Sequence, residues 1–147
     1  MILYYIIMKN INHHNKVAIY DPEWSKTFLI ISPSCLFTGV TAGYCGYWVT
    51  GASEAAVFLS SFMHWRDPHP GWYIWRIVDI TVVHISFGIH VWALWNCPSS
   101  QALIAMACAA SCFAWSLRYH SYTHHAAGWF FSCLSNLLLT HNRYNYC

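Results

Sequence analysis

The sequence predicts an all-α protein, a polytopic transmembrane helix bundle of about five spans that forms one domain over residues 1–147. The chain is 57% hydrophobic and only 8% charged, whereas a soluble domain carries roughly a quarter charged residues. Its nine Trp and ten Tyr residues stand mostly near the ends of the apolar stretches, as aromatic residues do at membrane interfaces. The small net charge of +2 leaves no basic footprint for a nucleic acid.

Hydropathy distinguishes five apolar stretches, and each begins and ends at turn-forming or charged residues. Residues 1–24 precede them as a cytoplasmic or interfacial segment without the pattern of a signal peptide. Asp21 is a candidate N-cap ahead of Pro22, and Pro33 is expected to kink the first span. The second span is short, so it must tilt or stop within the membrane. The expected spans are 27–49, 52–65, 76–95, 102–117 and 120–139.

The basic residues fall almost entirely on one side of this arrangement. With five spans, the N-terminus and the connections at 66–76 and 118–120 share a side, whereas an even number would scatter the charges. The positive-inside rule makes that side cytoplasmic. We therefore expect an integral, multi-pass protein with a cytoplasmic N-terminus, located in the endomembrane system. The basic residues on this side are Lys9, Lys16, Lys26, Arg66, Arg76 and Arg118, and only Arg143 lies on the other.

Polar residues gather at the cytoplasmic ends of three spans. His64 ends the second span, and Ser60 lies one turn before it. Asp79 lies one turn inside the third span, and His120 and His124 stand one turn apart at the start of the fifth. Residues four positions apart share a helix face, and ionisable residues inside a membrane are usually functional. We therefore expect these five side chains to surround one site.

Three imidazoles with an open fourth position are typical of a catalytic zinc site. Zinc lowers the pKa of its bound water toward neutrality and so supplies a nucleophile. The expected zinc ligands are His64, His120 and His124. Asp79 is expected to orient or deprotonate the water, and Ser60 to hydrogen-bond the water or the developing oxyanion.

The stretches "SSFMHW", "RIVDI" and "HSYTHH" resemble the superfamily of membrane hydrolases that includes the alkaline ceramidases and the adiponectin/progestin receptors. The shared pattern is Ser-x3-His, then an Asp, then a C-terminal His-x3-His. The resemblance implies zinc on His64, His120 and His124, with Ser60 and Asp79 beside the metal-bound water. It implies that the protein lies in the lipid bilayer and hydrolyses an amide or ester bond of a membrane lipid, and that this substrate is ceramide-like. The superfamily has seven spans, so this chain would be a truncated, divergent member.

Two other interpretations also use these histidines. A non-catalytic, receptor-like membrane protein would keep zinc only as a structural link between helices. The di-iron lipid desaturases and hydroxylases carry histidine boxes, which His64 with His69 and His120 with His124 and His125 resemble. A di-iron site would need His69 and His125, which the zinc interpretation leaves dispensable, and we expect His125 to lie on a different face from His124.

His84 and His90, both deep in the third span, raise a haem interpretation. Paired with histidines of other helices, either could ligate a haem b in an electron carrier. The two residues are six positions apart and lie on different sides of a helix, so they cannot both face one haem. A visible absorption spectrum distinguishes this interpretation from the others.

Overall fold

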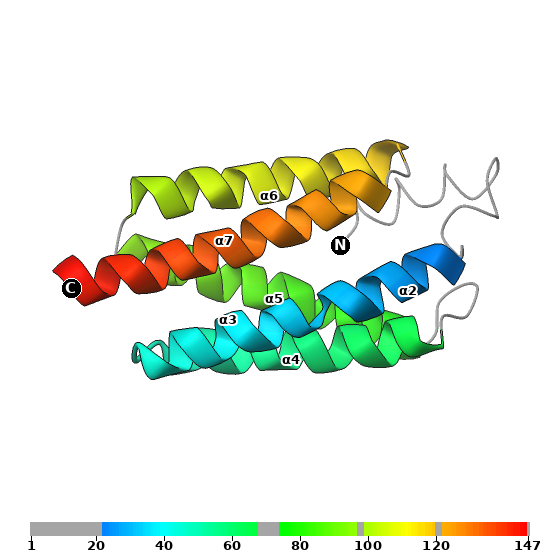
Figure 1. The fold of residues 1–147 in the computed structure, drawn as a ribbon, viewed down its shortest axis with the longest axis horizontal. Helices are drawn as coiled ribbons and strands as arrows, with labels where there is room; N and C mark the ends of the chain where they lie inside the picture. Colours follow the sequence, from blue (N-terminus) through cyan, green and yellow to red (C-terminus); the bar gives the residue numbers. More distant parts are fainter. Residues whose placement is uncertain (1–21, 68–73, 97–98, 120–121, 147) are drawn as a thin grey trace.

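The computed structural model describes residues 22–67, 74–96, 99–119 and 122–146, in which all regular secondary structure is helical. The all-α prediction is therefore confirmed. The helices run side by side along the long axis of an elongated bundle (Figure 1). They are α2 (Pro22–Ile31), α3 (Pro33–Tyr44), α4 (Trp48–Arg66), α5 (Ile74–Asn96), α6 (Ser100–Tyr119) and α7 (Tyr122–Tyr146).

Helices α2 and α3 together form the first predicted span. They meet at Ser32, directly before Pro33, where a kink was expected, because proline has no N–H for the helical ladder. The prediction that this span continues to residue 49 is wrong. The chain turns after Tyr44 at Gly46, whose φ of 83° favours glycine. Helix α4 therefore begins at Trp48 rather than at residue 52, and its 19 residues are not short.

Helices α3 and α4 cross closely at two facing glycines. A Cβ atom on Gly51 would lie 2.7 Å from the carbonyl oxygen of Gly39. A Cβ atom on Gly39 would lie 2.9 Å from the Cβ atom of Glu54. Small residues allow this approach of two backbones, as they do between membrane helices. The crossing brings Glu54 against α3, where Thr38 Oγ1 donates to its Oε2 over 3.4 Å.

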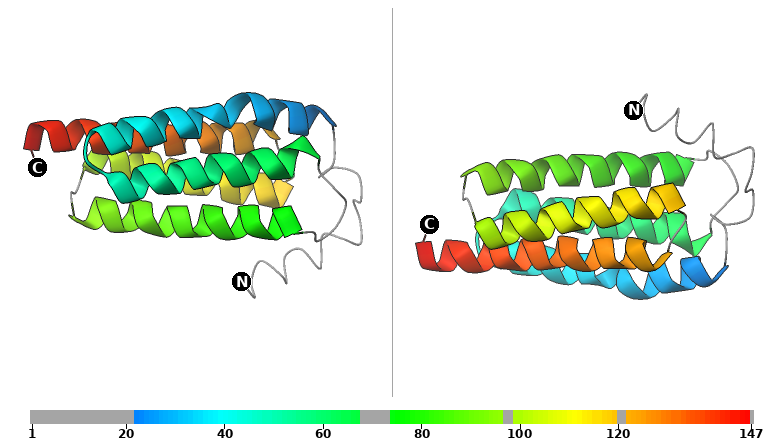
Figure 2. Two further views of the ribbon diagram at one scale, coloured as in Figure 1. Left: turned by 90° about the horizontal axis from the view of Figure 1, so that it is seen from below. Right: turned by 90° about the horizontal axis from the view of Figure 1, so that it is seen from above.

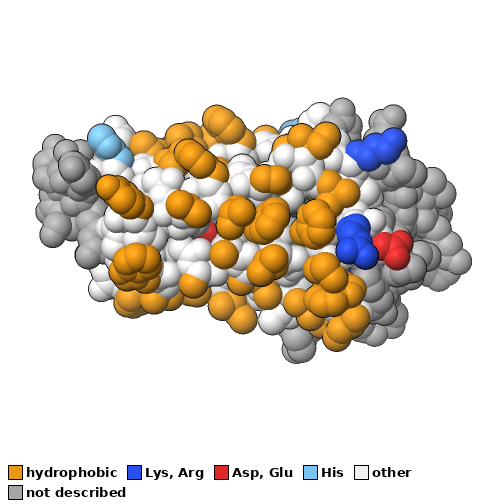
Figure 3. Space-filling model, turned by 60° about the horizontal axis from the view of Figure 1, so that its bottom comes forward, with side chains coloured by type: hydrophobic (Ala, Val, Ile, Leu, Met, Phe, Trp, Pro, Cys, Tyr) orange, Lys and Arg blue, Asp and Glu red, His pale blue; other side chains and the backbone are white. Residues whose placement is uncertain are grey.

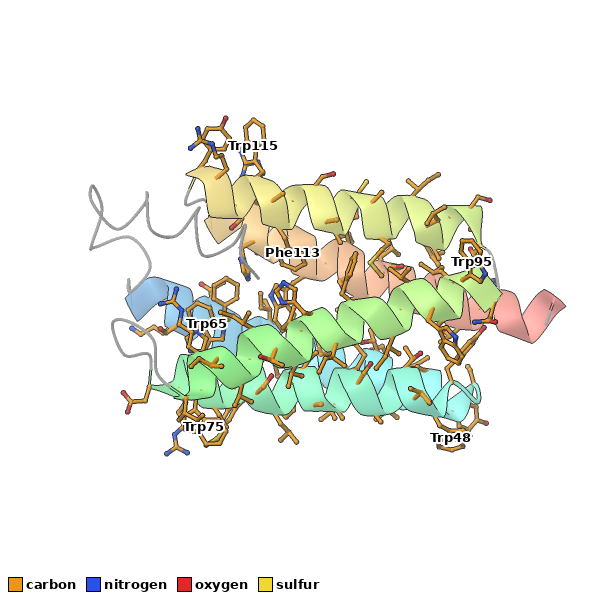
Figure 4. The ribbon with its side chains drawn as sticks, turned by 180° about the vertical axis from the view of Figure 1, so that it is seen from behind. Trp48, Trp65, Trp75, Trp95, Phe113 and Trp115 are labelled. Carbon is orange, nitrogen blue, oxygen red and sulfur yellow. The ribbon has the colours of Figure 1, made fainter. Side chains whose placement is uncertain are left out.

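The described helices pack as an open ring. Helix α5 packs closely on α4, α4 on α2 and α3, these two on α7, and α7 on α6. Among the described helices, α5 packs closely only on α4, and α6 packs closely only on α7. The ring is therefore open between α5 and α6, and we call this side the α5–α6 seam. Figure 4 looks onto the seam from behind, and Figure 2 shows two further sides. At one end of the seam, α5, α6 and α7 meet in an apolar cluster. Its residues are Ala93, Leu94, Ala102, Met106 and Leu139.

The outer surface is apolar along the middle of the bundle. Two helical stretches are long and apolar enough to cross a membrane, namely Ser25–Tyr44, which α2 and α3 form together, and Ile74–Asn96; Ser100–Ser116 is a shorter apolar helix. Large apolar side chains lie on the outside, with Ile30 78% and Phe37 66% exposed. An apolar surface of this extent marks contact with a membrane or a partner.

Charged and aromatic side chains mark the two ends of the bundle. Helices α2 and α5 begin, and α4 and α6 end, at the same end of the molecule (Figure 1). Lys and Arg side chains gather at this end, which we call the basic end, and apolar side chains cover the face beside it (Figure 3). Trp65, Trp75 and Trp115 stand toward the basic end, and Trp48 and Trp95 stand at the other (Figure 4).

Candidate functional site

Asp79 is the centre of a polar cluster near the basic end. Its side chain points from α5 toward α4 and the residue is 9% exposed. Ser61 Oγ donates to Asp79 Oδ1 over 2.6 Å, and Ser60 Oγ donates to the same oxygen over 2.9 Å. The structure thus brings together Ser60 and Asp79, two of the five residues that the sequence placed in one site.

Ser61 is a site residue that the sequence analysis missed. A hydroxyl group has one proton to donate, and Ser60 divides its proton between Asp79 and the carbonyl oxygen of Val57, 3.1 Å away. Ser61 makes the shorter bond to Asp79 and lines the cavity described below. The sequence signal was the Ser-Ser pair, but periodicity alone does not separate two neighbouring hydroxyls before His64.

A cavity of about 450 Å³ lies inside the bundle, a volume typical of small-molecule sites. Its basic end is polar and includes His64, Arg76 and Asp79. Apolar side chains form most of its walls, among them Val57, Val83, Phe87, Met106, Phe113 and Trp129. Glu54 and His90 line its deep end. The cavity therefore joins a charged end to an apolar interior.

His64 reaches the cavity from the last turn of α4. The residue is 8% exposed and its ring lies 4.6 Å from that of Trp65. Arg76, which is 7% exposed, lines the same end of the cavity. An imidazole, a guanidinium group and a carboxylate thus face one space, where the low dielectric strengthens their interactions. These are group types that acid–base catalysis and oxyanion stabilisation use.

His125 also lines the cavity, although we expected it to face away from the site. Its Nδ1 atom lies 3.3 Å from Ser116 Oγ. Its ring meets Phe28 and Phe113 edge to face, at centroid distances of 4.7 and 5.1 Å. The α7 helix is therefore rotated so that His125, and not its neighbour, points inward.

His124 lies on the outer side of α7. Its side chain is exposed and its ring lies 5.8 Å from that of Trp115. Neighbouring positions of a helix differ by about 100° in direction, so packing that turns His125 inward turns His124 outward. The third expected ligand, His120, lies outside the described residues.

The described residues do not assemble the expected zinc ligands. No three His, Cys, Asp or Glu side chains in the described part of the chain come together to hold a metal ion. His64 lines the cavity and His124 does not, and His120 lies outside the description. The di-iron interpretation needs His69, which also lies outside the described residues.

A second polar cluster closes the deep end of the cavity around His90. His90 Nδ1 donates to the carbonyl oxygen of Ser86 over 2.8 Å, because a carbonyl oxygen only accepts. His90 Nε2 faces Glu54 Oε1 at 3.2 Å and Asn136 Oδ1 at 2.5 Å. The Nε2 atom of the imidazole therefore lies between a carboxylate and an amide in the interior of the bundle. The cluster joins α4, α5 and α7.

The two histidines of the haem interpretation lie in different surroundings. His84 is exposed, and its Nδ1 lies 2.6 Å from the carbonyl oxygen of Ile80. His90 is buried, and its Nε2, the atom left to bind an iron, faces Glu54.

No known protein family, curated protein or solved structure matches this chain. A functional assignment therefore depends on the chemistry of the site, as it does for any fold that hosts many activities.

Proposed function

We propose that the bundle crosses a membrane five times, with the basic end and the N-terminus in the cytoplasm. Four observations support this: two long apolar helices, exposed apolar side chains, Trp at both ends and basic residues at one. Basic residues favour the cytoplasmic side. Helices α4, α6 and α7 have 19, 20 and 25 residues, close to the roughly 20 that cross the hydrocarbon core.

We further propose that the protein hydrolyses an amide or ester bond of a membrane lipid, with a ceramide-like lipid as the first candidate. The observation that carries this proposal is the Asp79 carboxylate, held by Ser61 at the polar end of an apolar-walled cavity. The linkage between the headgroup and the acyl chain of a lipid lies near the membrane interface. Asp79 lies one turn inside the basic end, which suits that depth.

The residues at this end of the cavity have complementary roles. Both serine bonds go to Asp79 Oδ1, and among the described residues this leaves Oδ2 to accept the proton of an attacking water. Arg76 stabilises the oxyanion that forms on the carbonyl group. Asp79 then passes the proton taken from the water to the departing amine or alcohol, which returns the carboxylate to its starting state, while His64 lines the same end of the cavity. Ser60 and Ser61 position the carboxylate.

Zinc enters this proposal only through the resemblance. On that basis His64, His120 and His124 would hold the ion, which would supply a water of lowered pKa. The outward position of His124 does not fit this ligand set. For that reason no step of the proposed reaction depends on the metal.

A second candidate is a receptor-like protein that binds a lipid in the same cavity without cleaving it. The observation that favours it is the cavity itself, because apolar walls with a polar end suit a bound lipid whether or not a bond is cleaved. The two candidates predict the same occupant and differ only in whether a bond is broken.

Release of free fatty acid tests the proposal. The purified chain is placed in vesicles of a dialkyl-ether phosphatidylcholine, which cannot release fatty acid, with either ceramide or a diacyl ester lipid added, and the product is measured by mass spectrometry. Asp79→Asn keeps the shape of the side chain and removes the base, so we expect release to fall about a hundredfold or more. Asp67→Asn changes an exposed carboxylate at the same end and is the matched control.

Two results would contradict hydrolysis. One is release by the unaltered chain that does not exceed that of vesicles without protein, for both lipid classes. The other is equal release by Asp79→Asn and Asp67→Asn. Lipid that binds without being cleaved would favour the receptor-like candidate.

A further inference from the structure

The cavity opens sideways, through the α5–α6 seam. Val83 and Phe87 of α5 line the cavity and are also 36% and 47% exposed on the outer surface. Ala110 of α6, on the opposite side of the seam, lines the cavity and is exposed as well. A side chain with both properties lies where the cavity meets the surface. These three residues define an opening that we call the lateral mouth.

The lateral mouth lies at the depth of lipid acyl chains. Val83 and Phe87 follow Arg76 by 83 − 76 = 7 and 87 − 76 = 11 residues, which is about 10 and 16 Å along a helix. Ala110 precedes Arg118 by 118 − 110 = 8 residues, or about 12 Å. The hydrocarbon core is about 30 Å thick. In the proposed membrane orientation, the mouth therefore opens into the hydrocarbon core of the bilayer, at a greater depth than the lipid headgroups.

The surface around the mouth has the same apolar character. Val91 of α5, one turn beyond Phe87, is 45% exposed, and Leu103 of α6, two turns from Ala110 on the same side of its helix, is 59% exposed. Inside the mouth the walls continue with Val57 and Met106, which are buried. An acyl chain can pass from the outer surface to the cavity without leaving an apolar environment, which avoids the cost of exposing it to water.

We propose that the lateral mouth admits one acyl chain of a membrane lipid directly from the bilayer. The chain then lies along the cavity, and its carbonyl group stops beside Asp79, which is 83 − 79 = 4 residues closer to the basic end than Val83. The cleavage of that carbonyl linkage rests on the function proposed above. The entry of the chain does not, because it requires no chemical step.

Photolabelling locates the chain without relying on turnover. The full chain is placed in phosphatidylcholine vesicles that contain a phosphatidylcholine with a diazirine in one acyl chain. After irradiation, the labelled residues are identified by mass spectrometry. We expect adducts inside the cavity, on Val57 and Met106, in addition to adducts on the outward residue Ile104.

A matched pair of variants on α6 tests whether the chain enters through the mouth. Ala110→Phe places a ring in the mouth, whereas Ala107→Phe places the same ring on an exposed position that does not line the cavity. We expect Ala110→Phe to lower labelling of Val57 about tenfold, equivalent to about 1.4 kcal/mol of binding free energy, and Ala107→Phe to leave it unchanged. Labelling of the outward residue Ile104 is the internal control. It should be the same in both variants as in the unaltered chain when the variants are folded and inserted in the bilayer.

Several outcomes would overturn the proposal. These are labelling of the outer surface alone, equal loss of Val57 labelling in both variants, and labelling of Val57 by a photoactivatable sterol but not by the acyl chain. Asp79→Asn separates entry from hydrolysis, since it should label as the unaltered chain does and release no fatty acid. If the unaltered chain labels at Val57 but releases no fatty acid, hydrolysis fails and lateral entry stands.

Discussion

Ser61 of α4 and Asp79 of α5 are joined inside the bundle by a hydrogen bond of 2.6 Å. Because α4 is the described helix on which α5 packs closely, this bond also sets the position of the carboxylate relative to the rest of the ring. Ser60 donates to the same oxygen, but it shares its proton with a backbone carbonyl group. The two serines are therefore not equivalent.

The first prediction concerns this pair. Ser61→Ala should lower both thermal stability and fatty acid release more than Ser60→Ala does. Hydrogen bonds between membrane helices contribute about 0.6 kcal/mol on average and up to about 1.7 kcal/mol, and we expect Ser61 near the upper value. Thermal unfolding in detergent and the vesicle assay measure the two effects. Equal effects of the two substitutions would assign Ser61 no special role.

The second prediction concerns the close crossing of α3 and α4. Gly51→Ala should lower the melting temperature, because the new Cβ atom would lie 2.7 Å from a backbone oxygen and the helices must separate. Gly88→Ala is the control, since a Cβ atom there meets nothing within 4 Å. On α5 that change should raise stability by up to about 1 kcal/mol through helix propensity. A similar melting temperature for the two variants would disprove the close packing.

The third prediction concerns the buried contact of Glu54 with His90 at the deep end of the cavity. Glu54→Ala should destabilise the bundle by about 1–3 kcal/mol, because it leaves the buried His90 imidazole without its carboxylate partner. Glu54→Gln keeps an acceptor oxygen and should cost less. Thr38→Val removes a hydroxyl that is shared between this carboxylate, at 3.4 Å, and the carbonyl oxygen of Cys35, at 3.1 Å, and it should have the smallest effect. The order of the unfolding temperatures of the three variants tests this prediction. Equal unfolding temperatures for Glu54→Ala and Glu54→Gln would contradict it.

The fourth prediction separates the two neighbouring histidines of α7. His125 lines the cavity between Phe28 and Phe113, and His124 is exposed. His125→Ala should therefore leave a gap in the cavity wall and lower fatty acid release about tenfold or more, and His124→Ala should change it little. Zinc analysis of the same preparations, with His64→Ala and His120→Ala beside them, tests the resemblance. One zinc per unaltered chain that is lost in His64→Ala, His120→Ala and His124→Ala, but kept in His125→Ala, would favour the three-histidine set over the described placement.

The fifth prediction concerns orientation in the membrane. In a variant without other cysteines, Asp67→Cys should react with a membrane-impermeant maleimide only from the cytoplasmic side. Tyr44→Cys, at the opposite end of the bundle and 89% exposed in the native residue, should react only from the other side. Labelling of both from one side would exclude the proposed topology.

Several features of the fold could be predicted from the sequence because they depend on local chemistry. The all-α class follows from apolar stretches with few charges, and the break at Pro33 follows from its missing N–H. The proximity of Ser60 and Asp79 was also predictable, since both are close to one end of successive antiparallel helices. The turn at Gly46 was not, because its neighbours are apolar and hydropathy does not distinguish an apolar turn from a helix.

The composition and order of the chain by themselves determine that helices form, where most of them end and which end of the bundle is basic. Only the tertiary structure decides which face of each helix points inward. A rotation of about 100° exchanges His124 for His125, and packing of α7 against Phe28 and Phe113 sets that rotation. The open α5–α6 seam and the pairing of Glu54 with His90 likewise depend on which helices become neighbours, and contacts between residues far apart in the chain determine that choice.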